Sequence, residues 1–318
     1  QLIQKIAKMI NQAQEIYFVG CGTTGVVSMC ARYLFAKIAK KKVNFEYGSE
    51  FSHLEEILEP NSLVIGISQS GETIDTLEAI EMAKAKNCQT ACITNVKNST
   101  ISRASDATIL INAGIEKAVA STKATTSQLG ILILLAFACI DKTMQAKQIL
   151  HDASGKINDM LNPRYENILL KLAAKIKDSS DIYIIGKGIN FPVAKEAAIK
   201  LQEISYIHAE AFAGGELKHG PLALIQKDTP VIVIASKDKN YHDILSNAIE
   251  IKSRGGLIIG ISPESNEAFD IWLKVPKHDI DAAIINLIPI QLLSYFLGIL
   301  KNNNPDKPRN LAKSVTVK

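Results

Sequence analysis

The stretch Ile16-Tyr-Phe-Val-Gly-Cys-Gly-Thr-Thr-Gly-Val-Val27 places an apolar, β-branched run directly before three glycines in the pattern G-x-G-x-x-G. A strand that leads through a glycine turn into a helix is typical of a doubly wound α/β unit. Because Glu46 closes the next apolar run, the glycines match most of a dinucleotide-binding fingerprint. The motif on its own is often misleading, so an NAD enzyme is an alternative that rests on this pattern alone.

The glycine turn belongs to an internal repeat. Three landmarks recur at an offset of 166 or 167 residues: Gly20-x-Gly22 with Gly186-x-Gly188, residues 49–53 (Ser-Glu-Phe-Ser-His) with 215–219 (Gly-Glu-Leu-Lys-His), and 64–67 with 231–234. The second copy lacks the third glycine, so we interpret the first two as a tight turn that needs positive φ. We therefore expect two copies of one unit, residues 1–145 and 146–300, followed by a polar tail, 301–318.

Short apolar runs alternate with helical stretches of about 12–18 residues in both copies, a pattern typical of a parallel sheet with crossover helices. The predicted strands are 16–19, 43–46, 63–67, 90–94 and 107–111, then 182–185, 231–235, 257–261 and 272–275. The fold class that follows is α/β, with two doubly wound units.

Composition excludes several classes of protein. With 47% hydrophobic and 21% charged residues among 318, the chain is globular rather than disordered. A net charge of +4 without any block of five like charges gives no indication of nucleic-acid binding. The apolar runs Leu129–Ile140 and Leu287–Leu300 are too short or too interrupted to span a bilayer, so no membrane segment is expected.

Five cysteines without a C-x-x-C pair indicate a reduced, cytoplasmic protein whose thiols are small core residues. No signal peptide is visible at the amino end. The chain begins with Gln1 rather than Met, so we expect a fragment of a longer protein.

The segment Ile67-Ser-Gln-Ser-Gly-Glu-Thr-Ile-Asp-Thr76 follows a predicted strand and opens a helix. Backbone N–H groups at a helix start, with the hydroxyls of Ser68, Ser70 and Thr73 beside them, can hold an anion without any basic side chain. The alternative is an ordinary Ser/Thr helix cap. The density of hydroxyls at the carboxyl end of a parallel strand favours a phosphate site, which the second copy lacks.

A second hydroxyl cluster, Val119-Ala-Ser-Thr-Lys-Ala-Thr-Thr-Ser127, also precedes a predicted helix. By itself it is typical of capping residues and a polar turn. Thr23 and Thr24 lie in the first glycine turn and can reach the same pocket.

The second copy carries the acid–base candidates. Glu196, Lys200 and Glu203 are spaced i, i+4, i+7 and share one helix face. An exposed ladder of ion pairs is the alternative for such a face. The following stretch, residues 204–221, is rich in Gly, His and Glu, which is typical of a loop over a site, and His219 within it is a candidate proton carrier.

The tail Pro308-Arg-Asn-Leu-Ala-Lys-Ser-Val-Thr-Val-Lys318 alternates apolar and polar residues. This pattern favours docking over a frayed terminus. A docked tail would bring Arg309 and Lys313 to the body of the protein.

Several of these segments resemble one family over the whole length of the chain. The matching motifs are Ser68-Gln-Ser-Gly-Glu-Thr73, Val119-Ala-Ser-Thr-Lys123, Glu203–Ala211, Gly215–Ile225 and Pro308–Val317. They resemble the isomerase half of the glutamine–fructose-6-phosphate aminotransferases, also called glucosamine-6-phosphate synthases. The resemblance implies two tandem sugar-isomerase (SIS) domains, each a three-layer sandwich around a five-stranded parallel sheet.

The resemblance also implies roles for individual residues. Glu203 would move the proton between C1 and C2, with Lys200 and Glu196 in support. His219, from the neighbouring subunit of a homodimer, would open the sugar ring. Lys313 would form a Schiff base with the open-chain ketose, with Arg309 beside it. Substrate binding would fall to these residues: Thr23, Thr24, Ser68, Gln69, Ser70, Thr73, Val119 and Ser121.

The implied reaction converts fructose 6-phosphate and ammonia to glucosamine 6-phosphate, the first step of amino-sugar synthesis, with no metal and no cofactor. The ammonia would come from an N-terminal glutaminase domain that has no counterpart in this sequence. A regulator that binds sugar phosphates without chemistry is the alternative. It is disfavoured because Glu203, His219 and Lys313 are all present.

Overall fold

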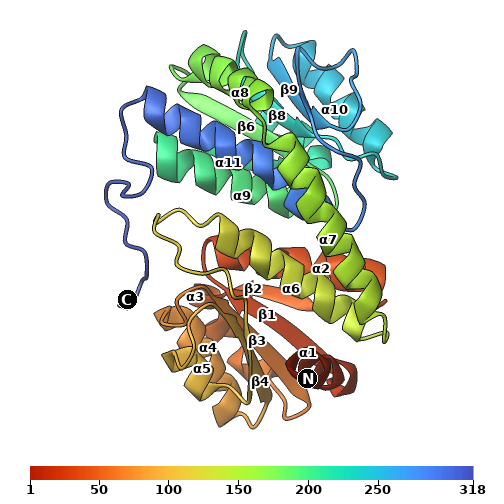
Figure 1. Ribbon diagram of the computed structural model, residues 1–318, viewed down its shortest axis with the longest axis vertical. Helices are drawn as coiled ribbons and strands as arrows, with labels where there is room; N and C mark the ends of the chain where they lie inside the picture. The colour runs from red at the N-terminus through yellow and green to blue at the C-terminus, as the bar shows by residue number, and fades with distance from the viewer. Residues whose placement is uncertain (318) are drawn as a thin grey trace. The chain divides into compact units, whose positions relative to one another are not determined.

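The computed structural model describes residues 1–317, which form two compact units (Figure 1). Unit 1 contains residues 1–148 and the tail from Asn310 onward, and unit 2 contains Ile149–Arg309. Each unit has its own five-stranded sheet, in which every strand pair is parallel. The predicted α/β fold with two repeated doubly wound units is confirmed.

Unit 1 is built on the strand order β2-β1-β3-β4-β5. Its strands are β1 (Glu15–Gly20), β2 (Asn44–Tyr47), β3 (Ser62–Ser68), β4 (Gln89–Thr94) and β5 (Ala107–Leu110). Its helices are α1 (Leu2–Gln12), α2 (Thr23–Ile38), α3 (Gly48–Phe51), the 3-10 helix η1 (Ser52–Ile57), α4 (Ile74–Ala85), α5 (Thr100–Ala104) and α6 (Lys123–Ala138).

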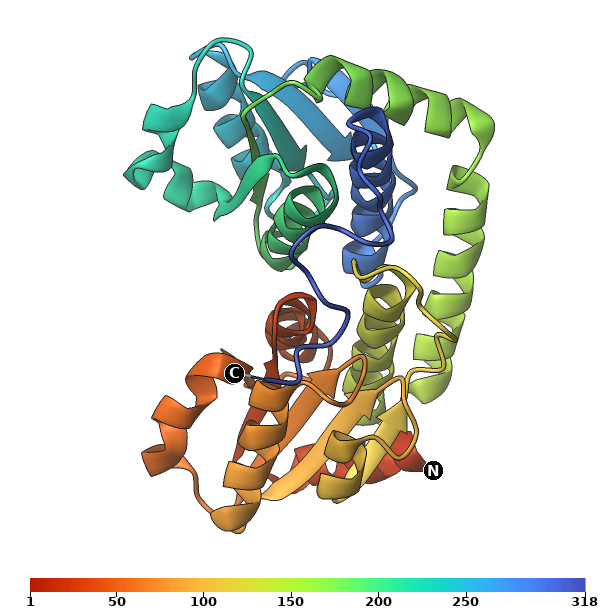
Figure 2. The same ribbon diagram turned by 90° about the vertical axis from the view of Figure 1, so that its left-hand side faces the viewer.

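The sheet of unit 1 is covered on both faces, with α4 and α5 on one side and α1, α2 and α6 on the other (Figures 1 and 2). Successive side chains of β1 point alternately toward the helices on one face of the sheet and toward those on the other. Tyr17 and Val19 join the cluster around Phe51 and Ile80, whereas Phe18 packs against α2. All seven residues of the central strand β3 are buried. Burial on both faces explains why the strands are continuous apolar runs.

Unit 2 has the order β7-β6-β8-β9-β10, which matches that of unit 1 position by position. Its strands are β6 (Asp181–Gly186), β7 (His208–Ala213), β8 (Pro230–Ile234), β9 (Leu257–Ser262) and β10 (Ile271–Lys274). Its helices are α8 (Pro163–Ile176), α9 (Asn190–Ser205), η2 (Gly214–His219), η3 (Pro221–Leu224), α10 (Tyr241–Lys252) and α11 (Ala282–Leu300). Helix α7 (Thr143–Met160) carries the chain from unit 1 into unit 2.

Strand β7 corrects the prediction that residues 204–221 form a loop. His208–Ala213 pairs in parallel with β6 along its whole length, and only the residues beyond it form the short helices η2 and η3. As an edge strand with polar His208 and Glu210, β7 lacks the apolar run that identifies a central strand. The repeat contained the missing signal, because Asn44–Tyr47 shifted by 166 residues falls on 210–213, inside β7.

Helix α11 has 19 residues and a mean hydropathy of 1.9, so it meets the length and composition of a membrane span. We predicted that Leu287–Leu300 is too short or too interrupted to span a bilayer. By length and composition that prediction was wrong, because the helix begins at Ala282 and continues through Pro289. Of its apolar window, 67% is buried inside the protein, where the helix packs against α9 and α8. A core helix meets the same criterion, so the apolar sequence is explained by burial in unit 2.

All five cysteines are free thiols, and four of them are buried, as predicted. Burial raises the pKa of Cys139 to about 11, which keeps that thiol protonated and unreactive.

The strand order of unit 1 decides where a ligand can bind. Strand β2 lies on one side of β1, and β3 lies on the other side. The chain therefore leaves the neighbouring strands β1 and β3 toward opposite faces of the sheet. In open α/β sheets, ligands bind at this switch point, outside the carboxyl ends of the strands. The two turns that the sequence singled out, residues 20–25 and 68–73, both lie there.

Candidate active site

The turn after β1 needs its three glycines for different reasons. Gly22 has φ +53°, but Gly20 is not among the residues with positive φ. A Cβ on Gly20 would lie 2.7 Å from backbone atoms of Thr24, and one on Gly25 would lie 2.6 Å from the ring of Tyr47. The prediction of positive φ was therefore wrong for Gly20, whose missing side chain lets α2 approach β1. Gly25 is explained by packing on Tyr47 and does not by itself indicate a nucleotide.

Thr23 and Thr24 begin α2 at the carboxyl end of β1. The Thr24 hydroxyl closes the turn, because it donates to the carbonyl of Cys21 over 2.9 Å and accepts from the N–H of Cys21 over 3.0 Å. A phosphate that bonded to Thr24 would therefore share a hydroxyl that already has two partners.

The hydroxyls of the turn after β3, residues 68–73, are bonded to one another and to its backbone. Ser68 is 1% exposed, its Oγ lies 2.8 Å from the Thr73 Oγ1, and it accepts from the N–H of Gly71 over 3.0 Å. The Ser70 Oγ accepts from the N–H of Glu72 over 3.1 Å. Thr73 occupies the N-cap of α4 but makes no capping bond with its side chain. The plain capping alternative does not explain this turn.

Gly71 fixes the shape of the same turn. Its φ is +69°, and a Cβ would lie 2.0 Å from the Ser99 Oγ. The carbonyl of Gln69 accepts from the N–H of Asn95 over 3.0 Å, which ties the turn to the end of β4. The turn is therefore rigid before any ligand arrives, as a binding site that avoids a large ordering cost requires.

The tail docks on this turn. The Ser314 Oγ lies 3.0 Å from the Ser70 Oγ, and the carbonyl of Val315 accepts from the N–H of Ile74 over 3.2 Å. Ile74 is the first residue of α4, whose opening N–H groups have no partner within the helix. The prediction that the tail docks rather than frays agrees with these contacts, which lie within unit 1.

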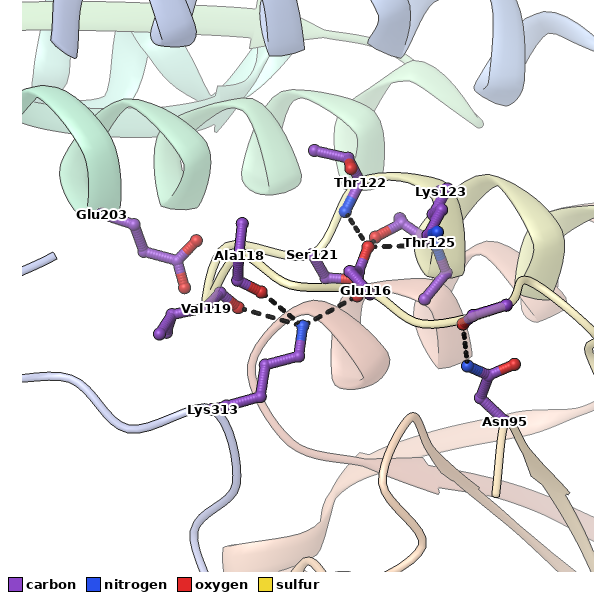
Figure 3. A network of polar contacts seen from close by, with 12 residues as sticks. Asn95, Glu116, Ala118, Val119, Ser121, Thr122, Lys123, Thr125, Glu203 and Lys313 are labelled. Atoms are coloured by element: carbon purple, nitrogen blue, oxygen red, sulfur yellow. Dashed lines mark hydrogen bonds and ion pairs between the residues drawn. The ribbon is translucent and has the colours of Figure 1, made fainter. Parts of the chain in front are cut away.

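Lys313 reaches a loop that precedes α6 (Figure 3). Its Nζ lies 2.9 Å from the Glu116 Oε2, 2.7 Å from the carbonyl of Ala118 and 3.5 Å from the carbonyl of Val119. Ser121 lies two residues further on, and its Oγ accepts from the Thr125 hydroxyl over 3.0 Å. Three sequence candidates, Lys313, Val119 and Ser121, are thus close together on one face of unit 1.

Glu116 is a functional candidate that the sequence motifs did not reveal. Burial alone would raise its pKa, but the hydrogen bond from Lys313 and the N–H groups of Thr122 and Ala124 outweigh that effect, so the pKa is lowered. Its carboxylate therefore stays charged at neutral pH. The sequence held only a weak signal, a lone acidic residue three positions before Val119.

Glu196, Lys200 and Glu203 meet inside unit 2. The Lys200 Nζ lies 2.5 Å from the Glu203 Oε2 and 3.4 Å from the Glu196 Oε1. The exposed-ladder alternative is excluded, because the side chain of Lys200 is 0% exposed, that of Glu196 is 3% exposed and that of Glu203 is 23% exposed. Burial by itself would lower the pKa of Lys200, but the two carboxylates outweigh it and raise the pKa.

His219 and Arg309 lie elsewhere in unit 2. His219 ends η2 with its side chain exposed. The guanidinium of Arg309 stacks 4.3 Å from the centre of the Tyr206 ring, and its backbone N–H donates to the Tyr206 hydroxyl over 2.8 Å. Tyr206 is the residue that caps the carboxyl end of α9, and its φ is +57°. Because Tyr206 contacts Arg309, the helix that carries Glu203 also anchors the start of the tail.

In unit 2, the position that corresponds to the hydroxyl turn is filled by its own side chains. Asn190 donates to the Ser236 Oγ over 2.8 Å, and that oxygen lies 2.8 Å from the His278 Nε2. Asn286 donates to both Asn190 and Ser236 over 3.0 and 2.9 Å. Burial lowers the pKa of His278, which favours the neutral ring. The interpretation that a single copy carries the phosphate turn is consistent with this network.

Within residues 1–317, no group of three or more His, Cys, Asp and Glu side chains is arranged to hold a metal ion. The hydroxyl turn also has no basic side chain of its own. The chemistry that the candidate residues offer is therefore that of hydroxyls, carboxylates, an imidazole and an amine.

The model of the SIS domain family matches residues 9–138 and 175–300, one match in each repeat. The C-terminal domain of glucosamine-fructose-6-phosphate aminotransferase from Francisella tularensis superposes with a TM-score of 0.87 and 34% identity, over 96% of this chain and 89% of that one.

Two curated relatives carry the name glutamine–fructose-6-phosphate aminotransferase (isomerizing). That of Pyrococcus horikoshii is 41% identical over 98% of this chain and 53% of its own length. That of Thermococcus kodakarensis is 40% identical over 100% of this chain and 54% of its own length.

This chain spans about half the length of the curated relatives it matches. The two SIS matches together span about four fifths of it, and the Francisella structure covers 96% of it. The chain therefore belongs to the SIS domain family and, within it, to the group formed by the isomerase domains of the glutamine–fructose-6-phosphate aminotransferases.

Proposed function

We propose that this chain is the isomerase part of a glutamine–fructose-6-phosphate aminotransferase, and that it binds fructose 6-phosphate and converts it to glucosamine 6-phosphate. The observation that carries the proposal is the docked tail. It brings a primary amine, Lys313, and a hydroxyl, Ser314, to the unit that holds the rigid turn 68–73. A regulator that only binds a sugar phosphate would need the turn but not the amine.

The turn after β3 would bind the phosphate. The N–H groups at the start of α4 and the hydroxyls of Ser68, Ser70 and Thr73 offer donors to a dianion, and the helix dipole adds to their attraction. Gln69 and the turn of Thr23 and Thr24 would complete this site, while Val119 and Ser121 would line the sugar. Because the tail occupies part of the turn, we infer that phosphate binding rearranges the contacts of Ser314 and Val315.

Lys313 would react with the open-chain ketose. Its neutral amine adds to C2, and loss of water gives an iminium, which withdraws electrons from the C1–H bond. Ammonia then replaces Lys313 at C2 and regenerates the free amine. Glu203 removes a proton from C1, and return of a proton to C2 leaves an aldehyde at C1 and an amine at C2, which is glucosamine 6-phosphate.

Glu196 and Lys200 would support Glu203, because the buried ammonium holds both carboxylates on one face of α9. His219 would open the sugar ring from the neighbouring subunit of a homodimer, and Arg309 would assist at the start of the tail. In functional terms, residues 1–145 would bind the sugar phosphate, residues 146–300 would supply acid–base groups, and residues 301–318 would close the site.

Ammonia would come from a glutaminase domain of the full-length enzyme, since the relatives are about twice as long as this chain. We further propose that the protein works in the cytoplasm as a homodimer, without metal, cofactor, nucleic acid or membrane. Light scattering after size exclusion tests the dimer, for which a monomer at working concentration would be the contrary result.

The test of function measures isomerisation of fructose 6-phosphate to glucose 6-phosphate, which needs no ammonia. We expect Glu203→Gln to lower this kcat by about 100-fold or more, the range of a lost acid–base group. An imine at C2 leads to an amine at C2 and not to glucose 6-phosphate, so the covalent role of Lys313 is tested by borohydride trapping of fructose 6-phosphate on the protein, which Lys313→Ala should abolish. Lys307→Ala, which removes an exposed lysine from the same tail, is the matched control and should keep full activity. Wild-type turnover in Glu203→Gln or undiminished trapping in Lys313→Ala would contradict the roles, and saturable binding without turnover in the wild type would favour the regulator.

A further inference from the structure

Glu116 joins two parts of unit 1 that are far apart in the sequence (Figure 3). It lies in the loop between β5 and α6 and is only 9% exposed. Its Oε1 accepts from the N–H of Thr122 over 2.7 Å and from the N–H of Ala124 over 3.2 Å. Thr122, the N-cap of α6, makes no capping bond with its own side chain, so the carboxylate of Glu116 performs that task.

The second oxygen of Glu116 faces the tail. Its Oε2 lies 2.9 Å from the Lys313 Nζ, which also has the carbonyls of Ala118 and Val119 as acceptors at 2.7 and 3.5 Å. A neutral amine has two protons and one lone pair, whereas an ammonium has three protons. Three acceptors around one nitrogen, one of them anionic, therefore fit an ammonium, which has no lone pair with which to attack a carbonyl.

The loop that carries Glu116 is held independently of the tail. The Asn95 side chain donates to the carbonyl of Gly114 over 2.7 Å and accepts from the N–H of Ala113 over 3.0 Å. The N–H of Asn95 donates to Gln69 in the hydroxyl turn. The carboxylate and the turn 68–73 are thus fixed to the end of the same strand, β4, so Glu116 offers the tail a fixed position relative to that turn.

We propose that Glu116 is a positioning residue for Lys313: its carboxylate, fixed on the amino end of α6, holds the tail ammonium in place until the open-chain sugar displaces it. This inference rests on the proposed function for its consequence in the reaction. Its physical part, the ion pair that holds Lys313 and keeps the tail docked, does not depend on any reaction.

A capping role alone is the competing explanation, and Glu116→Gln separates the two. The amide oxygen of glutamine can still accept from Thr122 and Ala124, so the cap is kept. The amide nitrogen then faces Lys313, and a donor cannot hold an ammonium. Loss of the cap would lower the melting temperature, so an unchanged melting temperature in Glu116→Gln verifies that the cap survives.

The first measurement is the rate at which acetic anhydride acylates Lys313 without substrate, resolved by peptide mass spectrometry. We expect the rate in Glu116→Gln to rise at least about fivefold, because the tail opens more often without the ion pair and exposes the amine to the reagent. Asp106→Asn is the matched control: Asp106 also accepts from a backbone N–H, of Thr90, and pairs with a lysine, Lys84, but at the amino end of β5. That variant should leave the acylation rate of Lys313 unchanged.

The second measurement is borohydride trapping of fructose 6-phosphate on Lys313. Faster acylation of Lys313 together with an approximately tenfold lower second-order rate of trapping supports the proposal, because the amine is then more accessible but no longer held in position. Unchanged acylation in folded Glu116→Gln overturns it, and so does faster acylation with an unchanged trapping rate. If Lys313→Ala still traps the sugar, the proposed function fails, while the acylation rates still report whether the ion pair exists.

If Glu116→Gln does not fold, Lys313→Met tests the contact from the tail. We expect amide hydrogen exchange in residues 310–317 to accelerate at least about fivefold relative to Lys307→Met, since the tail loses an anchor that holds it against opening. Equal exchange in the two variants would overturn the proposal.

Discussion

Replacing Lys200 with methionine removes the charge at the centre of the buried cluster in α9 and nearly keeps the side-chain volume. Two carboxylates then remain within the protein, Glu196 at 3% and Glu203 at 23% side-chain exposure. Breaking a buried pair by removing one partner costs about 3–5 kcal/mol. Because Glu203 is partly open to water, we expect the lower end, about 3 kcal/mol of unfolding free energy.

The pH dependence of this loss has a definite sign. Without the ammonium, burial disfavours the charged form of the Glu196 carboxylate in the folded state, because that side chain is 3% exposed. A carboxylate that ionises less readily in the folded state destabilises the fold at higher pH, and protonation relieves the loss as the pH falls. We therefore expect the difference in stability between wild type and Lys200→Met to be smaller at pH 5 than at pH 8.

Urea unfolding measures this effect, because Trp272, the single tryptophan of the sequence, lies in β10 and reports on unit 2. Lys195→Met is the matched control on the same helix: Lys195 is half-buried beside the Phe191 ring, so it should cost less than about 1 kcal/mol. The double variant Lys200→Met/Glu196→Gln should recover part of the loss. A cost of Lys200→Met similar to that of the control, with equal m-values, would refute the reasoning.

Three further predictions concern the turns and the buried histidine. Gly71→Ala should raise the KM for fructose 6-phosphate at least about tenfold in steady-state kinetics, because the φ of Gly71 is +69° and a Cβ there would lie 2.0 Å from the Ser99 Oγ. An unchanged KM would exclude the turn 68–73 as the phosphate site. Gly20→Ala should cost more unfolding free energy than Gly22→Ala, whose Cβ would meet no atom within 4 Å; the reverse order in urea would contradict the close-approach explanation. The pKa of His278 is lowered from 6.5, so its stabilising effect should be present above pH 6.5 and lost as the pH falls below it; melting curves of His278→Gln should show less acid destabilisation than wild type.

Much of the fold was readable because a buried parallel strand has an unmistakable pattern. The run Leu63–Ile67 is apolar without interruption since β3 is buried on both faces. The repeated glycine turn established two copies because a strand-to-helix turn tolerates few residues at Gly22 and Gly188, where φ is +53° and +61°. The edge strand β7 was not predicted, because a strand with one neighbour needs no continuous apolar run.

The candidate site likewise contains residues that the sequence reveals and residues that it does not. The hydroxyl turn could be predicted, because all its donors come from six consecutive residues, 68–73. The role of Glu116 could not be predicted, because it depends on contact with Lys313, which is 197 positions away in the sequence. Spacing likewise left the helix face of Glu196, Lys200 and Glu203 ambiguous between an exposed ladder and a buried cluster.

The sequence by itself determined the two α/β repeats, the hydroxyl-rich turn 68–73 and the family to which these motifs belong, because each is encoded by residues that are local in the chain. The tertiary structure alone decided that Lys200 is buried between carboxylates, that the tail docks on the turn and that Glu116 receives Lys313. The physical reason is that burial and charge pairing depend on which distant segments pack together, and local periodicity carries no information about that choice.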